Sequence, residues 1–124
     1  MSNPMSQMLK IAEAIKDRDL AELASKQAYA RGLALARQDL IAQANTEMTE
    51  MAPDTSYRAR FELPRKAWRD ARIIVLGQKQ ALAYAAAESQ RLVASKSLGR
   101  ASVLQKLMNQ KELAQKRKAQ KSGD

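Results

Sequence analysis

The chain has 124 residues, a net charge of +9, and neither cysteine nor histidine. This composition excludes disulfides, thiolate nucleophiles and catalysis by imidazole. Because aromatic residues make up only 4% of the chain, the apolar core available to a compact monomer is thin, since burial stabilises in proportion to area. We therefore expect an extended, all-α protein that forms a homo-oligomer or part of a larger protein assembly.

Proline residues mark the predicted element boundaries. Pro53 ends the helix before it, and Pro64 suits the first position of a helix, where its missing N–H needs no partner. These signals predict a helix over 5–51, a connector over 52–63 and a second helix over 64–98. A basic C-terminal helix or tail is expected over 100–121, and the whole chain 1–124 is predicted to form a single helical domain.

The first predicted helix carries an apolar stripe at alternating spacings of three and four, the pattern of a coiled-coil seam. The stripe contains Leu20, Leu23, Gln27, Ala30, Ala34, Arg37, Ile41, Ala44, Met48 and Met51. Leu33 and Leu40 lie beside it and widen it beyond the area that one partner helix covers.

The connector combines aromatic and basic residues. Tyr57, Ala59, Phe61 and Leu63 alternate with Arg58, Arg60 and Glu62 in the period of an extended chain. This pattern suggests that one side of the connector packs on the helix ends while Trp68 covers the core. The alternative is functional: arginines grip phosphates and an aromatic ring stacks on an unpaired base.

The second predicted helix repeats the three-four spacing, with many small residues that allow close helix approach. Its predicted seam is Trp68, Ala71, Val75, Gln78, Leu82, Ala85, Ser89 and Leu92. If the two helices form an antiparallel, coiled-coil-like hairpin, the polar group Asp17, Arg18 and Asp19 lies opposite Leu98 in the weakly helical Ser-Leu-Gly segment.

Positive charge is concentrated in the second half of the chain. Residues 1–50 contain six Lys and Arg against seven Asp and Glu, whereas residues 51–124 contain 16 against six. Two clusters are candidate nucleic-acid contacts: an elbow cluster of Arg58, Arg60, Arg65, Lys66, Arg69 and Arg72, and a tail cluster of Lys111, Lys116, Arg117, Lys118 and Lys121. The tail can equally be a solvated helix end, because cations are favoured near a helix C-terminus.

The sequence predicts no enzyme, no cofactor, no metal site and no small-molecule substrate. Its four glycines are isolated, so no phosphate-binding loop is present. We expect a structural protein that holds nucleic acid, as in a phage virion or a nucleoid. The alternative is a coiled-coil adaptor that docks on an acidic protein surface, as in an export apparatus.

The expected location is the cytoplasm or a particle assembled there. The longest apolar runs, at 73–76 and 81–87, are much shorter than a membrane span, and the N-terminal residues do not resemble a secretion signal. Binding to an anionic membrane surface ranks last, because the helices carry few bulky aromatic residues.

Overall fold

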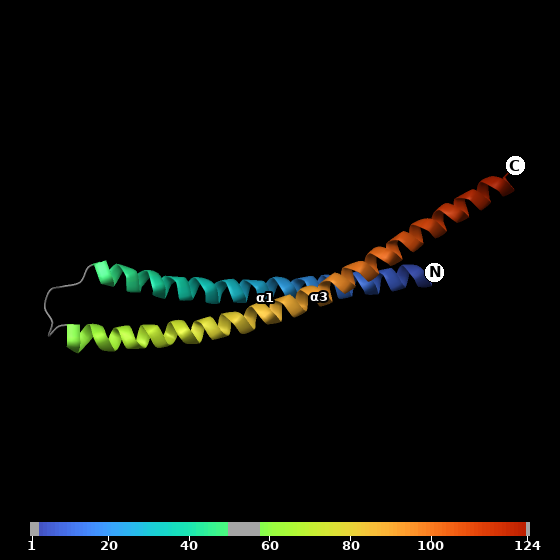
Figure 1. The fold of residues 1–124 in the computed structure, drawn as a ribbon. Coiled ribbons are helices and arrows are strands. Elements are labelled where there is room, and N and C mark those ends of the chain that lie inside the picture. The colour runs from blue at the N-terminus through green and yellow to red at the C-terminus, as the bar shows by residue number, and fades with distance from the viewer. Residues whose placement is uncertain (1–2, 50–57, 124) are drawn as a thin grey trace. The chain divides into compact units, whose positions relative to one another are not determined.

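The computed structural model describes residues 3–49 and 58–123, which form two long helices and one short one (Figure 1). Helix α1 covers Pro4–Thr49, η1 is a π-helical turn over Arg58–Glu62, and α3 covers Leu63–Ser122. All regular structure in these residues is helical, which confirms the all-α prediction. The predicted end of the first helix at residue 51 and residues 52–57 of the predicted connector lie outside the described residues.

Helix α1 begins with a local capping signal. The Asn3 side-chain oxygen accepts a hydrogen bond of 3.1 Å from the backbone N–H of Met5, and Pro4 occupies the first helical position. Asparagine is a strong N-cap, and proline at this position gives up only an N–H that would otherwise be unpaired. The Asn-Pro pair thus fixes where this helix starts.

The segment that leads into α3 differs from the predicted extended connector. Residues 58–62 form a π-helical turn that continues directly into α3. Phe61 and Leu63 are exposed, and Trp68 is 62% exposed, so none of them covers a core. The prediction that Trp68 covers the core of the hairpin is therefore wrong. Tyr57, which is predicted to pack on the helix ends, lies outside the described residues.

Helix α3 also continues through the point where the sequence predicts an end near Leu98. Ser97 donates its hydroxyl to the carbonyl oxygen of Val93 at 3.2 Å, a bond within the helix. Gly99 does not adopt a positive φ. A glycine inside a helix costs only about 1 kcal/mol relative to alanine, which the strong helix formers on both sides offset. One helix therefore takes the place of the predicted helix and separate tail.

Contacts divide the chain into two compact units. Unit 1 combines Met1–Ala24 with Glu88–Asp124, and unit 2 is Ser25–Ala87. Each unit contains one segment of α1 and one of α3. That the chain acts as a single domain stays a prediction.

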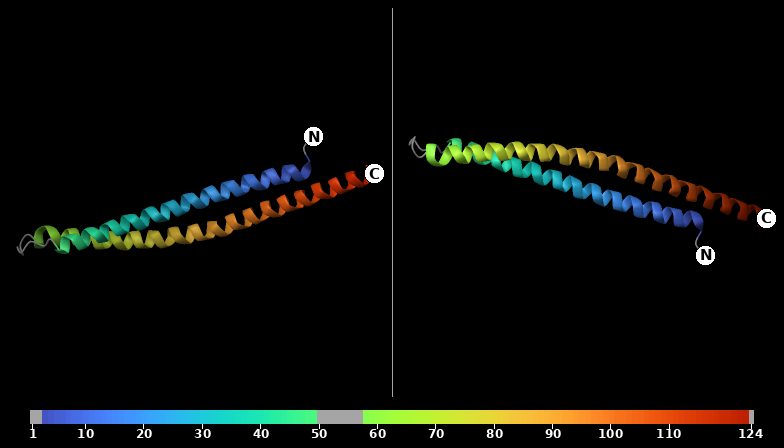
Figure 2. Two further views of the ribbon diagram at one scale, coloured as in Figure 1. Left: turned by 90° about the horizontal axis from the view of Figure 1, so that it is seen from above. Right: turned by 90° about the horizontal axis from the view of Figure 1, so that it is seen from below.

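In unit 2 the two helix segments run antiparallel (Figure 2). Glu47, near the end of α1, pairs with Arg69 near the start of α3. Farther from these ends, Arg37 lies against Gly77. A Cβ added at Gly77 would be 3.4 Å from Nε of Arg37. Ala30, in the α1 segment, is only 1% exposed. The hairpin arrangement predicted from the sequence is therefore present in unit 2.

In unit 1 the segments are joined by buried polar groups. The hydroxyl of Ser97 donates a hydrogen bond to Oδ2 of Asp19, and Gln90 Nε2 donates to the Asp19 carbonyl oxygen at 3.0 Å. Ala94 and Ala101 are buried on the same side of α3. The polar group around Asp19 thus faces the Ser-Leu-Gly segment, as the antiparallel arrangement requires.

The buried face of α3 is not the one predicted from the sequence. The predicted seam is exposed, most clearly at Trp68, Leu82 (73% exposed) and Leu92. The positions that are buried or half-buried are Arg69, Ile73, Leu76, Gly77, Gln80, Ala83, Ala87, Gln90, Ala94, Ser97, Ala101, Leu104 and Met108. Both series have the same three-four spacing and both contain large residues. From Ala83 to Ala101 the face packed against α1 consists of small or polar residues, which permits close helix approach.

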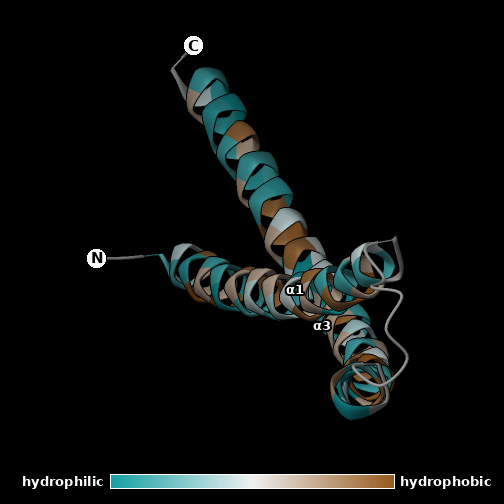
Figure 3. Ribbon diagram, turned by 90° about the vertical axis from the view of Figure 1, so that its left-hand side faces the viewer, coloured by the Kyte–Doolittle hydropathy of each residue, from teal (hydrophilic) through white to brown (hydrophobic). Residues whose placement is uncertain are grey.

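Hydrophobic and hydrophilic residues alternate along both helices, and the end of α3 is mostly hydrophilic (Figure 3). Within residues 3–49 and 58–123, no helix has an apolar stretch that could cross a membrane.

Candidate nucleic-acid interface

Four side chains of the elbow cluster are exposed in unit 2. Arg60 belongs to η1, and Arg65, Lys66 and Arg72 belong to the first turns of α3. The side chain of Arg58 lies outside the described residues. The exposed members can reach a ligand without rearrangement of the helix pair.

Arg69, the sixth member, is buried. Its Nη1 lies 2.7 Å from Oε2 of Glu47, and its side chain is only 6% exposed. Neither Nε nor Nη1 has an aligned hydrogen-bond acceptor among the described residues. The guanidinium therefore depends on the Glu47 charge, because a buried cation without a counter-ion is costly. This geometry suits a link between α1 and α3, not an external phosphate.

Trp68 lies between two exposed arginines. Arg65 precedes it by three residues and Arg72 follows it by four, so the three side chains share one face of α3. Arg65 Nη1 is 4.0 Å from Glu47 Oε1 and stays largely solvent-exposed, which makes this a weak surface pair. We call Arg65, Trp68 and Arg72 the elbow face.

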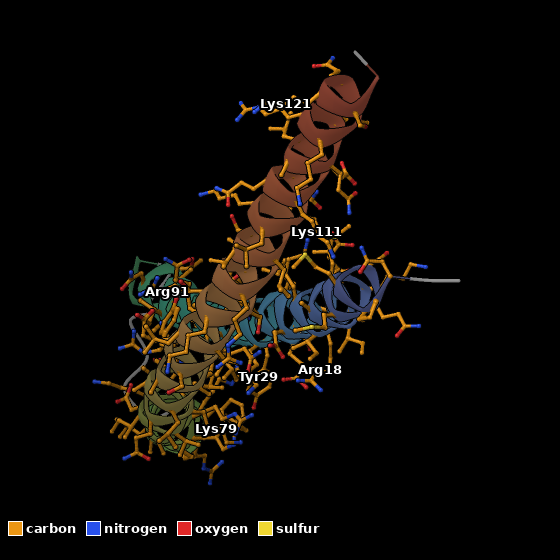
Figure 4. The ribbon with its side chains drawn as sticks, turned by 90° about the vertical axis from the view of Figure 1, so that its right-hand side faces the viewer. Arg18, Tyr29, Lys79, Arg91, Lys111 and Lys121 are labelled. Atoms are coloured by element: carbon orange, nitrogen blue, oxygen red, sulfur yellow. The ribbon has the colours of Figure 1, made fainter. Side chains whose placement is uncertain are left out.

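The tail cluster lies in unit 1, in the last turns of α3. All five side chains are exposed, and none forms an ion pair with a residue in the described ranges. Figure 4 shows Lys111 and Lys121 on this segment. Residues 109–123 are exposed at every position, so the helix presents cations in several directions. Such a segment can contact phosphates but offers no shaped pocket to select among them.

The strongest polar cluster of unit 1 was not predicted as a site. Asp19 is 3% exposed, and it accepts hydrogen bonds from Ser97 and, at 3.2 Å, from Arg18. The Ser97 bond, together with Arg18, holds the pKa of Asp19 below its usual value, although desolvation opposes the shift. A buried polar cluster of this kind fixes helix register. Its sequence signal is the polar break in an otherwise apolar helix stripe.

No group of His, Cys, Asp and Glu within residues 3–49 and 58–123 could hold a metal ion. Comparison of the chain with protein-family models, with curated proteins and with solved structures finds no match.

Proposed function

We propose that this protein is a non-enzymatic assembly component that oligomerises through its alanine-rich, coiled-coil-like helices and binds nucleic acid through its basic C-terminal half. It acts in the cytoplasm or in a particle assembled there, such as a virion or a nucleoid. The observation that supports this most directly is the elbow face, where Trp68 is 62% exposed between Arg65 and Arg72.

An exposed indole between guanidinium groups has the chemistry of a single-strand binder. A base stacked on an aromatic side chain contributes about 1–3 kcal/mol, and neighbouring cations neutralise the backbone phosphates. The tail cluster adds contacts that do not depend on base identity. We therefore expect a preference for single-stranded over double-stranded nucleic acid at the elbow face.

The chain carries its own probe for this interaction, because Trp68 is its only tryptophan. Titration with random-sequence single-stranded DNA is expected to quench Trp68 fluorescence. The apparent affinity should fall linearly on a log–log plot against salt concentration. Unchanged fluorescence, with no salt-dependent binding by an independent assay, would reject the proposed function.

Two sets of variants locate the contact. Trp68→Leu keeps an apolar side chain but removes the stacking surface, so it should weaken single-stranded binding more than duplex binding. The tail set replaces Lys111, Lys116, Arg117, Lys118 and Lys121 by glutamine. Its matched control replaces five exposed cations elsewhere by glutamine: Lys10, Lys26, Arg31, Lys79 and Lys96. Equal loss in both sets would show that net charge, not the tail, drives binding.

The adaptor function is the second candidate, and exposed apolar residues favour it. In unit 1, Met8, Ile11 and Val103 are all more than half exposed although they lie close to the packed helices. Sedimentation of the intact chain tests the oligomeric part of the proposal, and a monomer at all concentrations would contradict it.

A further inference from the structure

Unit 1 contains an open groove between its α1 and α3 segments, with a volume of about 660 Å³. Its lining is almost entirely apolar and includes Met8, Ile11, Ile15, Gly99, Val103 and Leu104. Among the described residues that line the groove, Arg100 alone is charged. None of the residues that line the groove belongs to the elbow face or to the tail cluster.

The residues that line the groove differ in burial. Ser97 is buried and Ala12 and Leu104 are half-buried, whereas the other lining residues are exposed. An added Cβ at Gly99 would meet nothing within 4 Å. Ile11 and Val103, at the edges, are 61% and 56% exposed. A ridge of apolar side chains from another helix would fit into such a groove.

The charges around the groove indicate the kind of helix that would bind. Arg100 is in the lining, and Lys96 and Lys106 lie seven residues before and three residues after Val103, on the same side of α3. All three cations are exposed. The edge of the groove along α3 is therefore positively charged.

Glu22 lies on the same face of α1 as Ile15, seven residues later, but no acidic group in the described residues forms an ion pair with Arg100, Lys96 or Lys106. Glu13 and Asp17 are each two residues away from Ile15, which places them on the other side of α1. Glu88 is bound by Arg91, with Oε1 2.7 Å from Nη2. The buried carboxylate of Asp19 is held by Arg18 and Ser97.

We propose that this groove binds an amphipathic helix of a partner protein, with an apolar ridge for the groove and acidic residues that meet Arg100, Lys96 and Lys106. This is helix-in-groove recognition, in which residues spaced by three or four supply the anchors. A second copy of this chain, docked through the same groove, would bring no carboxylate of its lining to these cations, because none of the lining residues is acidic. The inference does not depend on nucleic-acid binding.

A displayed library of helical peptides, with ridge and flank positions randomised, tests the proposal on the full-length chain. Selected peptides are expected to carry Leu, Ile or Met at positions spaced by three or four, and Asp or Glu beside them. Their affinity should fall about tenfold or more for Gly99→Phe, which fills the groove. Gly32→Phe is the matched control, because an added Cβ there also meets nothing within 4 Å.

A charge reversal gives a second, independent readout. Arg100→Glu should change the selected flank residues from acidic to basic without loss of the apolar ridge. Selection of peptides with no acidic preference, or equal binding to Gly99→Phe and the parent chain, would overturn the proposal. The proposal would also be overturned if the parent chain self-associated, or bound anionic phospholipid vesicles, and Gly99→Phe abolished that association or binding. Loss of Trp68 quenching by DNA bears only on the proposed function.

Discussion

Two alanines on α3 provide a direct test of which helix face is buried. Ala83 is 7% exposed and belongs to the buried series, whereas Ala85, two residues away, is exposed and belongs to the series predicted from sequence. Leucine at either site adds three carbon atoms with little change in helix propensity. The two substitutions therefore differ mainly in the space that surrounds the new side chain.

Ala83→Leu should destabilise the protein by about 1–3 kcal/mol, the usual cost of extra carbon atoms in a filled helix contact. The burial of three further carbons would be favourable by about 2 kcal/mol if there were room. Ala30 and Ala87 are also almost fully buried, although Ala83 itself borders an open groove of about 390 Å³ that Lys26 and Tyr29 help to line. The helices would have to separate and expose these alanines, so we expect the gain to be lost.

Ala85→Leu should change the free energy of unfolding by no more than about 0.5 kcal/mol, as for most surface substitutions. Urea unfolding followed by the helical circular dichroism signal measures both variants at one protein concentration. If Ala85→Leu is the destabilised variant and Ala83→Leu is not, α3 buries the predicted face, and the assignment made here is wrong.

Three further predictions concern single sites. Gly99→Ala should stabilise the protein by about 0.5–1 kcal/mol in urea unfolding, because helix propensity improves and no atom obstructs the methyl group; a loss of stability would show that this position is not open. Glu47→Gln should destabilise by about 1–3 kcal/mol, since Arg69 is left buried without its counter-ion, and Glu47→Gln should have almost no effect once Arg69→Met is present. The pKa of Asp19 is lowered because Ser97 donates a hydrogen bond to its carboxylate. The stability that this carboxylate contributes is therefore complete above about pH 4 and is lost as the pH falls through the lower pKa of the folded state. Ser97→Ala should flatten this acid limb of an unfolding series in pH, and an unchanged limb would contradict the assignment.

Several features of the structure follow from local signals in the sequence. Helix-forming residues without central prolines indicate two long helices. The polar group around Asp19 and the Ser-Leu-Gly segment at 97–99 interrupt the two stripes at matching distances from Met51 and Pro64, the predicted ends of the two helices. These matching distances predict that the two interruptions face each other. The hydrogen bond between Asp19 and Ser97 shows that they do. The charge difference between the halves of the chain is likewise a property of the sequence.

The choice between the two faces of α3 was beyond the sequence. Both stripes repeat at three and four residues, so periodicity favours neither. Residue type is misleading, because large apolar residues such as Trp68 and Leu82 belong to the stripe that the structure leaves exposed. The side chains of α1 decide the matter: Ala30 and Asp19 need small or polar residues opposite them, and the series through Ala83, Ala94 and Ser97 provides these. Large residues such as Trp68 and Leu82 are thereby left on the outside.

The role of each charged residue was decided in the same way. The elbow cluster looks uniform in sequence, yet Arg69 is turned toward Glu47 and the neighbouring Arg65 and Arg72 remain exposed with Trp68 between them. Sequence determines helices, charge and the places where regular patterns break. Tertiary contact determines which side of each helix is buried, because burial depends on the partner segment, which lies tens of residues away along the chain.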